Sequence, residues 1–269
     1  RRGFDMAVDF SGGDRGALCV LLSGAPVRCG YRKTGKGMFM RDRFFTHSVT
    51  PDFSKHTVDF HLDLVRTLGV EVQDVPLEMF VSDADRQAAQ GKVRAKGVGR
   101  DERYVVIHPA SRWFFKCWRR DGFAAVADHI AIKYGLQVVF TSAPDDRERD
   151  MVADILRLSS KPHINLAGEC SLKQLAAVIQ GAVLFVGIDS APMHMAQAVK
   201  TPVIVLFGPS GVHNWGPRGE RDAVLYRDWE CVPCGKDGCN GTKKSRCLDD
   251  IEPGEVIREV DHFLGTRIT

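Results

Sequence analysis

The sequence predicts an α/β protein of two lobes, in which parallel sheets are flanked by helices. Over most of the chain, short apolar runs alternate strictly with helical patterns, as in a doubly wound, Rossmann-like sheet. A strand–helix–strand pattern at residues 4–31 predicts a parallel sheet in the first lobe as well. Residues 97–103 (GVGRDER) form a charged, glycine-containing linker between the two patterns. We therefore expect an N-terminal lobe over residues 1–98 and a C-terminal lobe over residues 99–269.

In the first lobe, strands are predicted where apolar residues alternate, and helices where they recur every three or four positions. The predicted strands are residues 4–10 and 27–31, and the predicted helices are residues 15–23, 57–68 and 83–96. The last of these helices is polar and Ala-rich, which favours a surface position. Residues 32–50 are basic and aromatic with no clear period, so no element is predicted there.

The second lobe continues as strict alternation of strand and helix. The predicted strands are residues 104–108, 137–141, 164–166, 183–188 and 203–207, and the predicted helices are residues 121–134, 147–158, 171–180, 193–199 and 255–264. Ser171 is the expected N-cap of its helix. Because the carboxyl ends of parallel strands share one edge of a sheet, the polar loops that follow these strands should meet at a ligand crevice.

Composition excludes several classes of protein. A net charge of +3 is too small to indicate nucleic-acid binding, and no apolar run approaches the ~20 residues of a membrane-spanning helix. Four of the eight cysteines are scattered, which fits a reducing compartment and a cytoplasmic protein. The chain begins with Arg1 and opens directly into a strand, so we expect that further residues precede it.

The most informative stretch is residues 184–217, which predicts a strand, a sharp turn, a helix, a second strand and a Gly/Pro loop. Asp189 and Ser190 lie at the end of the first strand, and Pro192 suits the first turn of the helix. The free N–H groups at the start of such a helix favour a phosphate, and His194 lies within one turn of that point.

A second loop, residues 108–118 (HPASRWFFKCW), follows the strand at residues 104–108. Ser111 provides a hydroxyl and Lys116 a positive charge. Positive charge directed at a departing phosphate stabilises the negative charge that develops there, with no need for a metal ion.

These two stretches together resemble glycosyltransferase family 9, the ADP-heptose:lipopolysaccharide heptosyltransferases, and are most similar to the heptosyltransferase III branch. The family pattern appears as DSAPMH at residues 189–194, FGPS at residues 207–210 and Trp215. The first loop resembles the Thr/Ser-x-Arg and Lys-x-Trp pattern of the family: Lys116-Cys117-Trp118 fits the second part, whereas Ser111 and Arg112 are adjacent. The resemblance implies a GT-B architecture of two Rossmann-like lobes.

The resemblance also implies an activity and partners. Heptose would pass, with inversion, from ADP-L-glycero-D-manno-heptose to a lipopolysaccharide inner-core acceptor, at the inner face of the inner membrane. No cofactor would be required for this reaction, and neither nucleic acid nor a transmembrane segment would take part.

Site residues follow from the same resemblance. Lys116 and Asp189 are the expected catalytic residues, with Lys116 holding the diphosphate. The expected donor-binding residues are Ser111, Lys116, Glu148, Cys170, Asp189, Ser190, Ala191 and His194. The general base of the family lies in a Gly-Asp turn that we expect upstream of Arg1, and we do not assign this role to Asp14.

Four cysteines cluster in a loop rich in Gly, Lys and Asp. They are Cys231, Cys234, Cys239 and Cys247. The first pair has the spacing of a structural zinc site, and zinc, two disulfides and four free thiols all remain open. Similar clusters in the family imply a structural element, and we favour zinc slightly.

Two other functions remain open. A dinucleotide-dependent oxidoreductase predicts a Gly-x-Gly-x-x-Gly turn after the first strand, whereas Gly97 and Gly99 precede a strand. A non-catalytic nucleotide-binding or interaction protein could derive from such a transferase.

Overall fold

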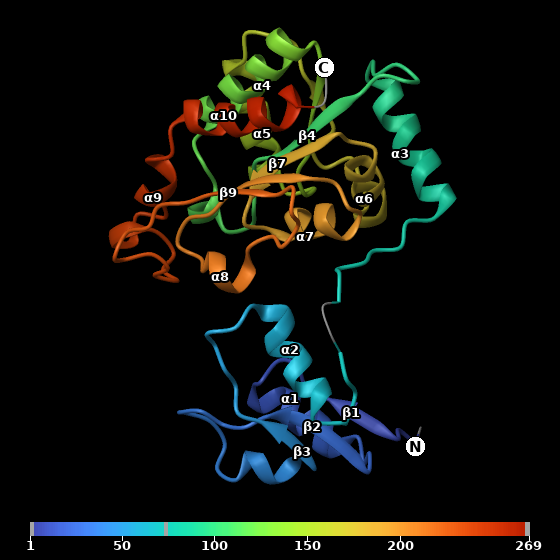
Figure 1. The fold of residues 1–269 in the computed structure, drawn as a ribbon, viewed down its shortest axis with the longest axis vertical. Helices are drawn as coiled ribbons and strands as arrows, with labels where there is room; N and C mark the ends of the chain where they lie inside the picture. Colours follow the sequence, from blue (N-terminus) through green and yellow to red (C-terminus); the bar gives the residue numbers. More distant parts are fainter. Residues whose placement is uncertain (1–2, 73–74, 267–269) are drawn as a thin grey trace. The chain divides into compact units, whose positions relative to one another are not determined.

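The computed structural model of the chain describes residues 3–72 and 75–266. The chain forms two compact units. Unit 1 comprises Arg1–Val75 with His213–Trp215, and unit 2 comprises Pro76–Val212 with Gly216–Thr269. Each unit contains its own parallel sheet, so the predicted α/β class is confirmed (Figure 1).

Unit 1 is built on a parallel sheet with the strand order β1-β2-β3. Its elements are β1 (Met6–Val8), α1 (Asp14–Leu22), β2 (Val27–Tyr31), the 3-10 helix η1 (Arg41–Phe44), β3 (His47–Val49) and α2 (Thr57–Arg66). The small core contains the buried residues Cys29, Tyr31 and Leu64. The sequence pattern did not predict β3, because a strand of three residues is too short to show a period; pairing with β2 defines it.

A network around Asp14 holds the segment between β2 and η1. The carboxylate of Asp14 accepts hydrogen bonds from the Met38 amide (3.1 Å) and from Nη1 of Arg41 (3.4 Å). Arg41 is only 6% exposed and also donates to the carbonyls of Gly12 and Tyr31. Asp14 therefore takes part in anchoring this loop.

Unit 2 contains a parallel sheet with the strand order β6-β5-β4-β7-β8-β9. Its strands are β4 (Tyr104–His108), β5 (Gln137–Phe140), β6 (Ile164–Asn165), β7 (Leu184–Ile188), β8 (Val203–Leu206) and β9 (Ala223–Leu225). In this sheet Val106 pairs with Val139 on one side and with Phe185 on the other. Five of these strands match predictions from the sequence, whereas β9 is too short to show a period.

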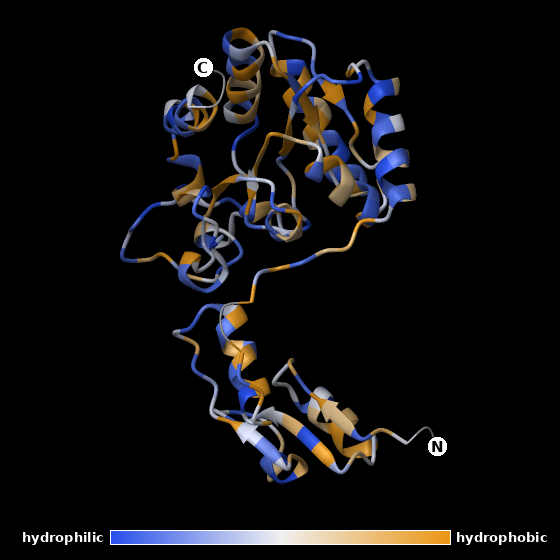
Figure 2. Ribbon diagram, turned by 45° about the vertical axis from the view of Figure 1, so that its right-hand side comes forward, coloured by the Kyte–Doolittle hydropathy of each residue, from blue (hydrophilic) through white to orange (hydrophobic). Residues whose placement is uncertain are grey.

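Helices cover both faces of this sheet (Figure 1). Its longer helices are α3 (Asp83–Ala95), α4 (Arg120–Tyr134), α5 (Asp146–Leu158), α6 (Leu172–Gln180), α7 (Ala191–Ala198) and α10 (Pro253–Gly265). Two short helices lie in the loops after β8 and β9: α8 (Val212–Trp215), of which His213–Trp215 belong to unit 1, and α9 (Arg246–Asp249). Figure 2 shows the strands of this sheet as mainly hydrophobic and its helices as a mixture of hydrophobic and hydrophilic residues.

The two faces have separate hydrophobic cores because alternate strand residues point to opposite sides. Val105 and Ile107 of β4 pack with α4, α5 and α10, whereas Val106 packs with α3, α6 and α7. As the sequence predicted, Ser171 caps α6, and its hydroxyl accepts a hydrogen bond from the Gln174 amide.

Helix α3 explains why the two units divide earlier than the sequence-based boundary between residues 98 and 99. Ala89 and Val93 of this helix are buried in the same core as α6, so the helix belongs to unit 2. The linker motif at residues 97–103 marks a turn within unit 2 instead of a gap between units. The boundary predicted from the glycine and charged residues of this linker therefore differs from the boundary between the two compact units, which follows from packing.

The last helix also packs within unit 2. Val256, Val260 and Leu264 of α10 are buried in the core that includes α4. The apolar face of α10 therefore lies against its own unit.

Candidate functional site

The candidate site lies at the carboxyl edge of the sheet in unit 2. Strand β7 lies between β4 and β8, so the loops that follow these three strands are neighbours. Helix α7 starts directly after β7, with Ser190 as its N-cap and Pro192 in its first turn. The Ser190 hydroxyl donates to the Ile188 carbonyl (3.3 Å) and makes no capping hydrogen bond to the helix. The start of α7 therefore presents main-chain N–H groups at this edge.

Lys116 and Asp189 form an ion pair at this edge. Nζ of Lys116 donates to Oδ2 of Asp189 at 2.7 Å, and the side chains are 25% and 8% exposed, respectively. The main chain of each residue in this ion pair is also hydrogen-bonded. The Asp189 amide donates to the Leu206 carbonyl, and the Lys116 amide donates to the Trp113 carbonyl. The structure therefore brings together the two residues that the sequence analysis named as catalytic.

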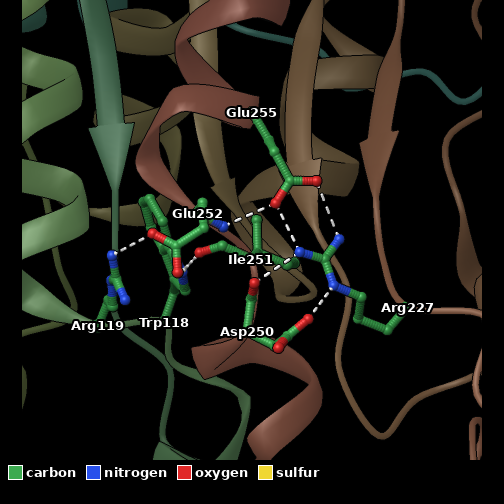
Figure 3. A network of polar contacts seen from close by, with 7 residues as sticks. All are labelled: Trp118, Arg119, Arg227, Asp250, Ile251, Glu252 and Glu255. Carbon is green, nitrogen blue, oxygen red and sulfur yellow. Dashed lines mark hydrogen bonds and ion pairs between the residues drawn. The ribbon is translucent and has the colours of Figure 1, made fainter.

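The loop that carries Lys116 is anchored on both sides. The hydroxyl of Ser111 accepts a hydrogen bond from the Trp113 amide (3.3 Å), which stabilises the turn before the 3-10 helix η2 (Phe114–Lys116). On the other side, Trp118 is buried and its Nε1 donates to the Ile251 carbonyl at 3.0 Å (Figure 3). These contacts fix the position of the loop from which the Lys116 side chain extends.

Figure 3 shows that a polar network surrounds this anchor. Arg227 donates to both carboxylate oxygens of Glu255 (2.6 and 3.1 Å) and to Oδ2 of Asp250 (2.6 Å). Arg119 donates to Glu252 at 3.0 Å. The network joins the start of α10 to the segment that follows β4, through Arg119, and to the segment that follows β9, through Arg227.

Glu148 lies in the first turn of α5, after strand β5. Asp145 caps this helix, and the Glu148 side chain is only 4% exposed. Its Oε2 accepts a hydrogen bond from the Ala143 amide at 3.0 Å, and burial raises the pKa of its carboxyl group. A buried carboxylate held at the sheet edge can accept hydrogen bonds from a ligand's hydroxyl groups.

The remaining predicted donor residues differ in their surroundings. Ala191 is exposed at the start of α7, and His194 is half-buried on the same helix. Cys170 is half-buried against the core that contains α6, and burial raises the pKa of its thiol. A ligand contact at Cys170 would therefore use the main chain.

The sequence analysis did not name His108 as a functional residue. This histidine ends β4 and is 4% exposed, and its Nδ1 lies 2.9 Å from the Thr141 hydroxyl. Burial lowers its pKa to about 4, so the ring is neutral at pH 7. A polar residue at the end of an otherwise apolar strand is the signal that would have found it.

The structure does not support the tentative zinc site. All four clustered cysteines are free thiols; Cys231 and Cys234 are exposed, whereas Cys247 is buried. Within residues 3–72 and 75–266, no group of three or more His, Cys, Asp or Glu side chains is placed to hold a metal ion. Burial, with Cys239 and Cys234 nearby, raises the pKa of Cys247 to about 11.

Two units, each with a parallel sheet flanked by helices, have the architecture of the GT-B class. Comparison with known proteins identifies the family within this class. Residues 1–244 match the model of glycosyltransferase family 9 (heptosyltransferase). The chain belongs to this family, which confirms the resemblance found in the sequence.

Relatives and solved structures agree with this assignment. Lipopolysaccharide heptosyltransferase 3 of Escherichia coli K12 is 34% identical over 80% of this chain, which spans 61% of that protein's length. A second Escherichia coli lipopolysaccharide heptosyltransferase 3 is 34% identical over 99% of the chain and 77% of its own length. The structure of E. coli ADP-heptose lps heptosyltransferase II shares the fold, with a TM-score of 0.78 at 21% identity, covering 99% of this chain and 78% of that one. Neither alternative function is favoured by these findings.

Proposed function

We propose that this chain transfers heptose from ADP-L-glycero-D-manno-heptose to a lipopolysaccharide inner-core acceptor, with inversion at the anomeric carbon. The observation that carries the proposal is the Lys116–Asp189 pair beside the start of α7, at the edge where doubly wound sheets bind ligands. Family membership supports a glycosyl transfer. The names of the heptosyltransferase 3 relatives support lipopolysaccharide as the acceptor.

In this proposal the donor's diphosphate lies against Lys116 and the main-chain N–H groups of Ser190 and Ala191. Glu148 accepts hydrogen bonds from the ribose, and the Cys170 main chain contacts adenine. Ser111 and His194 complete the donor contacts at the same edge. The negative charge on the departing ADP is stabilised by the lysine and the helix, so the proposed reaction assigns no step to a cofactor.

The chemical step is a single displacement. A hydroxyl of the acceptor attacks the anomeric carbon from the face opposite ADP, the bond from that carbon to the phosphate oxygen breaks, and the hydroxyl proton passes to a general base. We do not assign the base to Asp14, because its carboxylate already accepts hydrogen bonds from Met38 and Arg41.

We propose that the protein works in the cytoplasm against the inner face of the inner membrane. Within the described part of the chain, no helix combines the length and hydrophobicity that a membrane span requires. Residues 32–43, here called the cationic loop, contain five basic residues and one aspartate; Arg41 is buried, and the other four basic residues are exposed or half-buried. Phe39 is 84% exposed and Met40 is 41% exposed in this loop. Exposed apolar side chains among basic ones suit an anionic lipid surface.

The test is release of ADP from ADP-heptose in the presence of a truncated inner-core acceptor. Acceptor-dependent ADP release, with the heptosylated product seen by mass spectrometry, is the expected result. Lys116→Ala should abolish most of it, whereas the surface variant Lys161→Ala should not. Tight ADP binding without any transfer to a range of core acceptors would instead support a nucleotide-binding protein that does not catalyse.

A further inference from the structure

The cysteine-rich segment contacts two of the loops that surround the candidate site. We call residues 231–251 the strap; they follow β9 and include α9. The donor contacts proposed above leave the strap without a role. Its hydrogen bonds reach the loop after β8 and the loop after β4, which lie on either side of the loop that carries Asp189.

The first contact is with the loop after β8. The main-chain amides of Cys234 and Gly235 both donate to the Pro209 carbonyl, at 3.1 and 2.9 Å. Next to it, Leu248 packs so closely on Gly208 that a Cβ added there would lie 2.6 Å from Cδ1 of the leucine. The glycine of the FGPS motif therefore makes room for the strap.

The second contact is with the loop after β4. The Ser245 hydroxyl donates to the Phe115 carbonyl at 2.6 Å, and Ser245 is only 4% exposed. Phe115 directly precedes Lys116. Further along the strap, the Ile251 carbonyl accepts the hydrogen bond from Trp118, two residues after the lysine. The strap therefore contacts the chain on both sides of Lys116, at the main chain of Phe115 and at the side chain of Trp118.

We propose that the strap, through Ser245, is a positioning device for Lys116 and that Ser245 is a positioning residue of the donor site. This inference rests on the proposed function, because it assumes that Lys116 binds the donor's diphosphate. The position of a lysine ammonium group depends on the main chain as well as on the many side-chain rotamers. Because the main chain is already fixed, less conformational freedom must be lost when a phosphate binds. The hydrogen bond from Ser245 supplies that restraint at the residue before the lysine.

The experiment compares ADP with adenosine as ligands, using isothermal titration on the full chain. Ser245→Ala should weaken ADP binding about fivefold or more and leave adenosine binding unchanged, because only ADP reaches Lys116. The matched control is Thr201→Val. Thr201 is equally buried, and its hydroxyl donates to the Ile179 carbonyl at 2.8 Å, at the amino end of β8. This control should leave the affinities for both ligands unchanged.

A double-mutant cycle separates positioning from general destabilisation. In a Lys116→Ala background, Ser245→Ala should have no further effect on ADP affinity, because the residue it positions is gone. Ser245→Cys keeps the side-chain size but donates weakly, so it gives the same test if the alanine variant folds poorly.

The outcomes distinguish the two proposals. Equal weakening of ADP and adenosine by Ser245→Ala, or full ADP affinity in both Ser245 variants while Lys116→Ala weakens it, would overturn the positioning role alone. Unchanged ADP affinity in Lys116→Ala would overturn the phosphate role of the lysine, and the positioning role with it.

Discussion

Nζ of Lys116 lies 2.7 Å from Oδ2 of Asp189, although the two residues are 73 positions apart in the chain. Asp189 is the more buried partner, so the carboxylate orients the ammonium group while the lysine keeps one face open to solvent. A phosphate can approach that open face without breaking the pair. The aspartate at the end of β7 is therefore best understood as a support for the lysine, placed at the helix N-terminus.

The first prediction concerns this support. Asp189→Ala should weaken ADP binding about tenfold, because Lys116 loses the partner that orients it. The loss of stability should be small, about 1 kcal/mol, because the lysine that loses its partner is partly exposed. Isothermal titration and a thermal melt measure the two effects. Equal or tighter ADP binding in the variant would show that the carboxylate does not orient the lysine for phosphate.

The second prediction concerns Glu148 and the ribose. Glu148→Gln should reduce the preference for ADP over 2′-deoxy-ADP by about five- to tenfold, because a neutral amide accepts hydrogen bonds less strongly than a carboxylate. Competition titrations with the two nucleotides measure this ratio. Asp146→Asn, an exposed neighbour in the same helical turn, is the control. An unchanged ratio in Glu148→Gln would place the ribose elsewhere.

The third prediction concerns the cationic loop. Phe39→Ser should lower binding to vesicles that contain phosphatidylglycerol roughly five- to tenfold, because one exposed aromatic ring no longer enters the interface. Phe80→Ser changes a ring that is 78% exposed in unit 2 and should have no effect. Vesicle co-sedimentation at low and high salt measures the apolar and the ionic contributions to vesicle binding separately. If Phe39→Ser sediments with vesicles as the parent does, the membrane contact lies on another surface.

The fourth prediction is a pH dependence from His108. Its folded-state pKa of about 4 lies below the ordinary value of 6.5, so the unfolded chain takes up a proton first as the pH falls. The stability due to the neutral ring is present above pH 6.5 and is lost between pH 6.5 and about 4.

Urea unfolding followed by tryptophan fluorescence tests this dependence. Between pH 6.5 and about 4, the free energy of unfolding of the parent should fall by roughly 2–3 kcal/mol more than that of His108→Gln, because glutamine does not titrate. Parallel pH curves for the two proteins would mean that His108 is as easily protonated in the folded protein as in the unfolded chain.

Several features of the site could be predicted from the sequence because they depend on local patterns. The alternation of apolar runs defined the bounds of β2 and β4 and placed Asp189 at the end of β7. Parallel topology then required the loops after β4, β7 and β8 to share an edge. This reasoning brought Lys116 and Asp189 to the same region, although it could not show that they form an ion pair.

What the sequence by itself determined is therefore the α/β class, most strands and helices of unit 2, the capping of α6 by Ser171 and the family to which the chain belongs. Each of these depends on residues that are close together in the chain. Only the tertiary structure decided that α3 belongs to unit 2, that Asp14 anchors the cationic loop and that Ser245 holds the main chain before Lys116. These contacts join distant segments, and their partners are selected by packing and hydrogen-bond geometry that no local period in the sequence contains.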